Sequence, residues 1–317
     1  MLRRSLTALL PRNRLSILIF HRVGEAPDPM FPSEPCAASF DALLRGLRSR
    51  FAILPLADAV ARLRARTLPP GALVVTFDDG YADNLQVAAP LLARHGVPAT
   101  LFVATGYLDG GTMWNDLVIH AFRSSRRPAL DLSAVGLKAF PLASLDERRA
   151  ALARVLPALK YRPAHEREAD ARAILRIAEV DPPSPPMLDR PSLPALARFG
   201  VDVGAHTVTH PILAALAPAD AEREIIDGKR DLETTLGHAV PLFAYPNGKP
   251  GRDYTAEHVA MVRKAGFTAA VTTAQGAAGP HDDVFQLPRF TPWVQHPLKF
   301  DLLMLRNVAL GAPQRAA

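Results

Sequence analysis

The chain has 317 residues, of which 49% are hydrophobic and 21% charged, so a disordered or fibrous protein is excluded. Its formal net charge is +6, but the arginines are interspersed with acidic residues and no basic patch contains interleaved aromatics, which argues against nucleic-acid binding. Cys36 is the only cysteine, so intramolecular disulfides and thiolate zinc clusters are excluded. Any metal site must therefore use imidazole and carboxylate ligands.

The first 14 residues contain four arginines and no acidic residue, and we treat residues 1–14 as an N-terminal extension. The apolar run within them is too short for a signal-peptide core. No stretch of the sequence approaches the ~20 apolar residues needed to span a bilayer. We therefore expect a cytoplasmic protein that at most contacts the inner face of a membrane.

Six short apolar runs, most of them rich in β-branched residues, alternate along the chain with segments of helical periodicity. This alternation predicts βα units around a buried parallel sheet. The predicted strands, in chain order, are 15–20, 72–77, 99–104, 201–205, 242–245 and 268–273. The predicted helices between them are 40–48, 56–66, 84–95, 219–236 and 256–265.

Residues 115–194 interrupt this alternation, because they are rich in Ala, Arg and Leu and contain few β-branched residues. We predict a helical insertion within a domain that covers 15–317. A proline tract at 182–186 favours an extended connector near the end of the insertion. A docking motif for a partner domain is the less favoured interpretation of that tract.

Polar side chains follow directly after two of the predicted strands. Asp78 and Asp79 follow the second strand, and His206 and His210 follow the fourth at a spacing that would place both imidazoles on one face of a helical turn. Taken alone, the aspartates also suit a turn and the histidines an exposed helix. In a βα barrel the strand ends converge on one face, where two histidines and one carboxylate could form a three-ligand metal site.

Three motifs in the sequence resemble those of the polysaccharide deacetylase family, also called the NodB-homology or carbohydrate esterase family four. The motifs are TFDDGY at 76–81, HTVTHP at 206–211 and FAYPNG at 243–248. The third has the form found in the branch that contains poly-N-acetylglucosamine deacetylases. The resemblance covers roughly residues 15–290 outside the insertion, and it implies an α/β fold, a distorted, incomplete (β/α) barrel with a helical insertion.

The resemblance also implies a metal-dependent hydrolase that removes N-acetyl groups from amino sugars in a polysaccharide or glycolipid precursor. Asp79, His206 and His210 match the family's metal ligands, and Asp78 matches the general base. The implied cofactor is one divalent metal ion, zinc in the first place, with iron, cobalt and nickel as alternatives.

Further catalytic groups follow from the same resemblance. Tyr245 and Asn247 lie in the turn where the family supplies a backbone N–H to the oxyanion or substrate. A general acid must protonate the leaving amine, and we assign His21, which follows the first predicted strand, rather than His296. A structural histidine at the rim of the barrel is the alternative interpretation of His21.

The sequence departs from the family pattern where many relatives have an arginine that tethers the base, because Ala244 occupies that position. Arg289 could supply the missing charge from another strand, although an arginine on an exposed loop is nearly as compatible with the sequence. No fourth family motif is clear. Trp114 and Trp293 could stack on sugar rings, but core packing is the default interpretation of both.

Two other functions remain open at this point. One is an amidase that acts on a small non-sugar amide, and the other is a catalytically inactive barrel that binds glycans. The complete set of motif residues disfavours the inactive barrel. The expected partner is an N-acetylated glycan or lipid-linked sugar, with neither nucleic acid nor an obligate protein partner.

Overall fold

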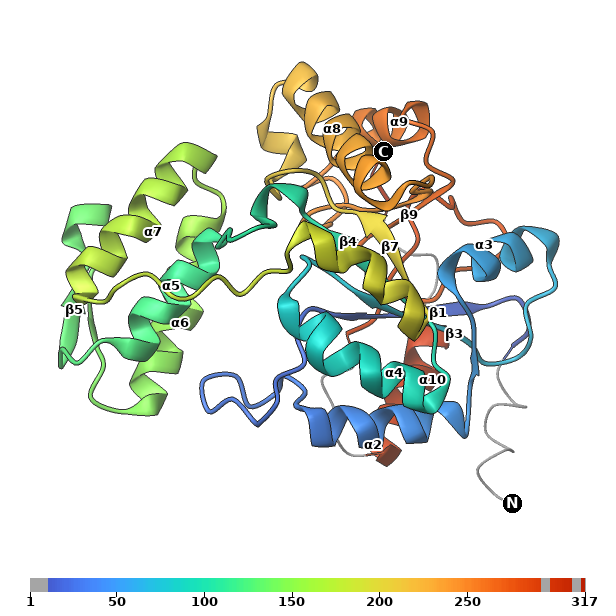
Figure 1. The fold of residues 1–317 in the computed structure, drawn as a ribbon, viewed down its shortest axis with the longest axis horizontal. Coiled ribbons are helices and arrows are strands. Elements are labelled where there is room, and N and C mark those ends of the chain that lie inside the picture. Colours follow the sequence, from blue (N-terminus) through green and yellow to red (C-terminus); the bar gives the residue numbers. More distant parts are fainter. Residues whose placement is uncertain (1–10, 292–296, 310–314, 317) are drawn as a thin grey trace. The chain divides into compact units, whose positions relative to one another are not determined.

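The computed structural model describes residues 11–291, 297–309 and 315–316, which fall into two compact units. Unit 1 comprises residues 1–27, 33–108 and 188–317, and unit 2 comprises residues 28–32 and 109–187. Figure 1 shows the elements of both units along the chain. Each unit has its own apolar core.

Unit 1 is built on a seven-stranded parallel sheet. The strands are buried along almost their whole length, as expected when helices cover a parallel sheet. In sheet order they are β1 (Leu15–Phe20), β3 (Ala72–Phe77), β4 (Ala99–Val103), β7 (Val201–Ala205), β8 (Leu242–Ala244) and β9 (Ala269–Val271), and β2 (Ala52–Ile53) pairs with the start of β3.

The two outer strands of this curled sheet are bridged by residues 287–290. Leu287 exchanges two backbone hydrogen bonds of 2.9 Å with residues in and directly after β9. Phe290 exchanges hydrogen bonds of 2.8 and 3.1 Å with β1. An irregular segment thus occupies a position that a regular barrel would give to a strand, which confirms the predicted distorted (β/α) barrel.

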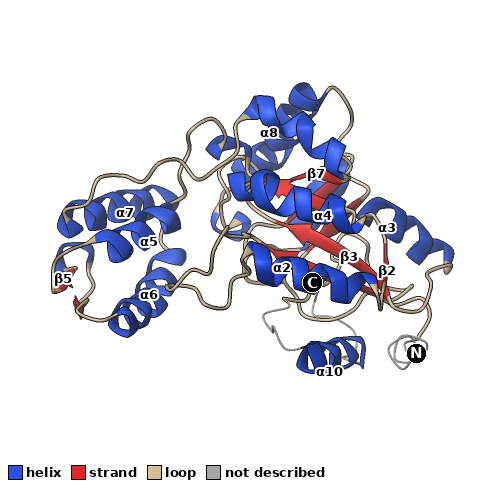
Figure 2. Ribbon diagram, turned by 60° about the horizontal axis from the view of Figure 1, so that its bottom comes forward, coloured by secondary structure: helices blue, strands red, loops and turns tan. Residues whose placement is uncertain are grey.

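Helices surround the sheet of unit 1, as the blue ribbons around the red strands show in Figure 2. Alternate residues of β1 contact different cores: Leu18 and Phe20 lie in one apolar cluster, and Leu15 and Ile17 lie in another. The helices are α2 (Ala37–Arg48), α3 (Leu56–Ala65), α4 (Ala89–His95), α8 (Pro218–Leu236), α9 (Ala256–Lys264) and α10 (Pro297–Ala309). Short helical segments are η1 (Asn84–Ala88), η2 (Thr105–Tyr107), η4 (Arg190–Phe199) and η5 (Leu213–Ala215).

The predicted strands and helices of unit 1 are confirmed to within a few residues at their ends. The predicted helix 84–95 differs in kind, because its first turn, η1, is a π-helix. Strand β2 was not predicted, since two residues carry no periodicity. None of the helices in the described part of the chain combines the length and the apolar character required to cross a membrane.

Unit 2 is mostly helical and contains a short antiparallel strand pair that the sequence analysis did not predict. Its helices bury one apolar face each in a shared core that includes Val118, Phe122, Val155 and Ile174. The unit starts at 109, ends at 187 and includes 28–32, so its bounds differ from the predicted 115–194. Its elements are α5 (Trp114–Ser124), β5 (Ala129–Asp131), η3 (Ser133–Val135), β6 (Ala139–Pro141), α6 (Leu145–Lys160) and α7 (Ala164–Ala178).

Candidate active site

The predicted site residues of unit 1 meet at the carboxyl ends of the parallel strands. Phe20, the last residue of β1, pairs in register with the last residue of β3, and the N–H of Asp78 donates to the Phe20 carbonyl at 3.0 Å. His21 and Asp78 are therefore the next residues along two adjacent strands. His206 follows β7 in the same way.

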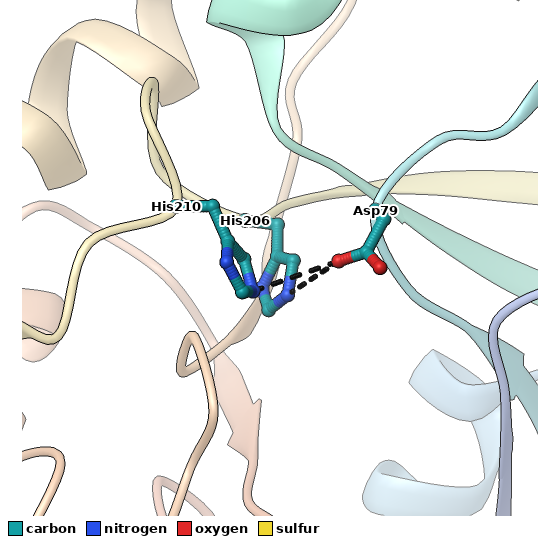
Figure 3. A group of neighbouring side chains, drawn as sticks. All are labelled: Asp79, His206 and His210. Carbon is teal, nitrogen blue, oxygen red and sulfur yellow. Dashed lines mark ion pairs between the residues drawn. The ribbon is translucent and has the colours of Figure 1, made fainter. Parts of the chain in front are cut away.

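Asp79, His206 and His210 form a compact group of potential metal ligands. Oδ1 of Asp79 lies 3.6 Å from Nε2 of His206 and 3.5 Å from Nε2 of His210, and Figure 3 shows both rings and the carboxylate directed toward one another. The ligand atoms of all three residues lie within 4.8 Å of one another. Atoms bound tetrahedrally to one zinc ion at its usual distances are about 3.4 Å apart, so the group fits such an ion.

The hydrogen bond of His206 leaves its Nε2 able to bind a metal. Nδ1 of the buried His206 lies 2.7 Å from the carbonyl oxygen of Ala244, the last residue of β8. A carbonyl oxygen can only accept, so Nδ1 carries the hydrogen and Nε2 keeps its lone pair. Backbone carbonyls commonly orient metal-binding histidines in this way.

The prediction that His206 and His210 share a helical turn is wrong. Residues 206–210 form a bent loop after β7, with Thr207 and His210 at φ of 65° and 51°. The N–H of His210 donates to Oγ1 of Thr207 at 3.2 Å and closes this turn. The imidazole ring centroids nevertheless lie 4.7 Å apart, because the sharp loop returns the chain to the same place that a helical turn would.

Asp78 lies beside this group but is bound by Arg289. The two terminal nitrogens of Arg289 donate to the two carboxylate oxygens of Asp78 at 2.7 and 2.6 Å, and Nε donates to the Thr272 carbonyl at 2.8 Å. Oδ2 of Asp78 is also 3.9 Å from Nε2 of His206. Burial alone would raise the pKa of Asp78, but the positive charge of Arg289, the hydrogen bonds from Arg289 and the neighbouring His206 imidazole lower it to about 2.

The alternative that placed Arg289 on an exposed loop is wrong. The residue belongs to the segment 287–290 that bridges β9 and β1, and its side chain is fully buried. It therefore reaches Asp78 from the closing segment beside β1 rather than from the third motif. Nη1 also contacts Oγ1 of Thr76 at 3.3 Å, so the guanidinium is fixed by several acceptors.

His21 is held at the end of β1 through its backbone. Nδ2 of Asn84, in η1, donates to the His21 carbonyl at 2.9 Å. Burial lowers the pKa of the His21 imidazole, the Asp78 charge opposes this, and Arg289 lowers the pKa further. His296, the alternative general acid, lies outside the described residues.

Within the third motif the structure separates Tyr245 from Asn247. The N–H of Tyr245 donates to the Val271 carbonyl at 3.2 Å, and its buried ring stacks on Tyr254 at a centroid distance of 3.9 Å. Because the N–H is used in the sheet and the ring in the core, the predicted role of Tyr245 at the oxyanion or substrate is wrong.

Asn247 retains the features required of that role. Its φ is 61°, and its backbone N–H donates to no acceptor among the residues that the structure describes. Thr273 fixes the turn, because its hydroxyl donates to the Asn247 carbonyl at 2.6 Å and its N–H to the Gly248 carbonyl at 2.9 Å. A Cβ at Gly248 would lie 2.9 Å from the Thr273 nitrogen, so this close approach requires glycine.

Several contributors to the site were not predicted from the sequence. Thr76 begins the first motif and Thr272 lies in the last predicted strand, but no contact was predicted for either. Both are fully buried and bind Arg289. Ala244 acts through its backbone, which leaves no signal in the side chain. Trp114 packs against the core of unit 2, with Arg167 over its ring, and Trp293 lies outside the described residues.

Two buried aspartates with different partners and two histidines lie together at the strand ends of a distorted barrel. This is the arrangement expected of a hydrolase whose site could hold a metal ion. The family model described as polysaccharide deacetylase matches residues 65–124 and 187–270, and the residues between the two ranges lie in unit 2. The chain belongs to the polysaccharide deacetylase family, as its motifs predicted, and the members of this family are hydrolases that remove N-acetyl groups.

Individual relatives agree with this assignment. YxkH of Bacillus subtilis (strain 168), assigned to the polysaccharide deacetylases by its name, is 21% identical over 87% of this chain and 70% of its own length. The deacetylase PplD of Streptococcus pyogenes, solved with acetate, has a TM-score of 0.60 at 18% identity and covers 93% of this chain and 98% of its own. IcaB of Ammonifex degensii has a TM-score of 0.60 at 19% identity, covering 91% and 97%. These two structures share the fold.

Proposed function

We propose that this enzyme removes N-acetyl groups from amino sugars of a polysaccharide or glycolipid precursor, and that it requires one divalent metal ion. The observation that carries the proposal is that two adjacent aspartates have different partners. Arg289 binds both oxygens of Asp78, whereas Asp79 faces two imidazoles at metal-ligand spacing. One carboxylate is thus kept for proton transfer and the other for metal binding.

Asp79, His206 and His210 would hold the ion, with zinc as the first choice and iron, cobalt or nickel as alternatives. When bound, such an ion lowers the pKa of water to roughly 7 and polarises a carbonyl oxygen. The three protein ligands leave positions open for water and substrate, as catalytic metal sites require.

The remaining residues are positioned to move protons and to stabilise charge. Asp78 stays ionised because its pKa is about 2, and Arg289 fixes its orientation as it accepts a proton from the attacking water. The N–H of Asn247 donates to the developing oxyanion. His21, at the end of β1, protonates the leaving amine.

The proposal is tested by measuring acetate release from N-acetylglucosamine oligomers and acetylated glycan extracts. The enzyme is assayed as purified, after chelation and after addition of single divalent metals, and small cyclic amides serve as the competing substrate class. We expect chelation to abolish release and one or more metals to restore it. Activity that survives complete removal of metal would contradict the metal requirement.

Variants separate the proposed roles. Asp78→Asn should retain the metal while kcat falls by about 10²–10⁴-fold, the usual contribution of a general base. His206→Ala and His210→Ala should lose both metal and activity. Metal content by atomic emission and acetate release are measured on the same samples, and full turnover by Asp78→Asn would refute its assignment as the base.

A further inference from the structure

We propose that Glu224 and Gly228 of α8 are positioning residues that hold the loop between His206 and His210 in the shape required for metal binding. The inference rests on the metal site proposed above. It concerns the backbone of residues 207–209, which contributes no ligand of its own. Neither residue of α8 belongs to the three motifs by which the family was predicted.

Glu224 binds this loop through three hydrogen bonds. Its Oε2 accepts from the backbone N–H groups of Val208 and Thr209, both at 2.8 Å, and its Oε1 accepts from the Thr209 hydroxyl at 2.7 Å. No lysine or arginine in the described part of the chain forms an ion pair with Glu224. Its carboxylate therefore binds the loop and not a basic side chain on the surface of the helix.

Gly228 lies one helical turn after Glu224 and therefore on the same face of α8. A Cβ at this position would lie 2.8 Å from the carbonyl carbon of Thr207 and 2.9 Å from its oxygen. The helix backbone thus packs directly on the loop, which only glycine permits. On another side, the N–H of Gly106 in η2 donates to the Val208 carbonyl at 2.8 Å, so the loop is held between two elements.

The conformation of the loop explains why such support is needed. Thr207 and His210 both have positive φ values, 65° and 51°, although neither is glycine. Threonine is β-branched, so this conformation is especially unfavourable for it. Strained backbone persists only where the surroundings determine it, and here the surrounding groups are those of α8 and η2. Without them the loop is free to relax, which would move the imidazole of His210 away from Asp79.

The test measures the affinity of the purified, metal-free enzyme for Co²⁺ by chelator competition and records the visible spectrum of the bound ion. We expect Glu224→Gln and Gly228→Ala to weaken binding by about 10–100-fold, the usual effect of losing a group that orients metal ligands. The matched control is Glu222→Gln, which lies on the same helix and pairs with Lys264 at 2.8 Å. It should bind Co²⁺ as the wild type does.

Gly228→Ala keeps the proposal testable if Glu224→Gln does not fold, because alanine favours a helix more than glycine does. A lowered melting temperature of the metal-free variants, with wild-type Co²⁺ affinity and spectrum, would show a purely structural role and overturn the proposal. Failure of the wild type itself to bind Co²⁺ would overturn the metal site and this inference together. A weakened affinity in Glu224→Gln and Gly228→Ala, but not in Glu222→Gln, would support it.

Discussion

The strand ends of unit 1 differ from the helices of unit 2 in the burial of their ion pairs and in the number of residues with an unfavourable backbone conformation. Asp78 and Arg289 form an ion pair whose side chains are 4% and 0% exposed, whereas the Arg127–Glu179 pair of unit 2 is 48% and 70% exposed. Four of the described non-glycine residues with positive φ lie at the strand ends: Asp79, Thr207, His210 and Asn247. Buried charge and strained backbone are concentrated where the chemistry is proposed to occur.

Unit 2 instead follows the local rules of helix formation. Helix α6 begins with a capping box in which Ser144 and Glu147 each bind the other's backbone N–H, and α7 ends at Glu179 in the left-handed conformation typical of a helix end. Its stability comes from these ends and from a shared apolar core. The two units should therefore respond differently to equivalent substitutions.

The largest difference is expected for the two arginines. Arg289→Met should lower the free energy of unfolding by about 3–5 kcal/mol, because it leaves the buried Asp78 carboxylate without its counter-charge. Arg127→Met, which breaks an exposed pair, should cost at most about 1 kcal/mol. Urea unfolding of both variants measures this difference, and equal losses would show that burial does not distinguish the two pairs.

A smaller effect is expected from acid. The folded-state pKa of Asp78 is about 2, below its ordinary value of 3.8, so its contribution to stability is present above pH 4 and is lost as the pH falls toward 2. The unfolded chain binds the extra proton in this range, and the free energy of unfolding falls with pH. Asp78→Asn should remove this part of the pH dependence in urea titrations between pH 5 and pH 2. A wild-type slope in that variant would assign the effect to other carboxylates.

The smallest effect is expected at the start of α6. Ser144→Ala should cost about 1 kcal/mol of stability, because the N–H of Glu147 loses the side-chain acceptor it has at 3.2 Å. We expect kcat/KM for acetate release to stay at the wild-type value, since the loss is local to unit 2. A change in kcat/KM larger than two-fold would show that unit 2 takes part in catalysis.

The sheet of unit 1 was predicted well because its strands are short, mainly apolar runs that alternate with segments of helical periodicity. The ends of β1, β3 and β7 agree with the prediction to the residue. The hairpin of unit 2 was not predicted, since its strands have three residues each and show no usable periodicity. The bounds of unit 2 also differ, because residues 28–32 join it from a distant part of the chain.

The site was predictable where side chains carry the information and unpredictable where the backbone does. Motif spacing brought Asp79, His206 and His210 together correctly, but it suggested a helical turn where the chain forms a strained loop. Tyr245 was predicted to contact the oxyanion or substrate, but its N–H is already bonded to the Val271 carbonyl in the sheet. The burial of Arg289 could not be predicted, because it depends on the pairing of the irregular segment 287–290 with β9 and β1.

Because residues 287–290 close the barrel, the active site is completed late in the synthesis of the chain. Asp78 and Arg289 are 211 positions apart, so the growing chain has made most of the domain before the partner of Asp78 exists. Until then a carboxylate at the end of β3 has no guanidinium and must remain hydrated or protonated. The active site can therefore reach its final electrostatic state only after the last part of the barrel has been translated and has docked between β9 and β1.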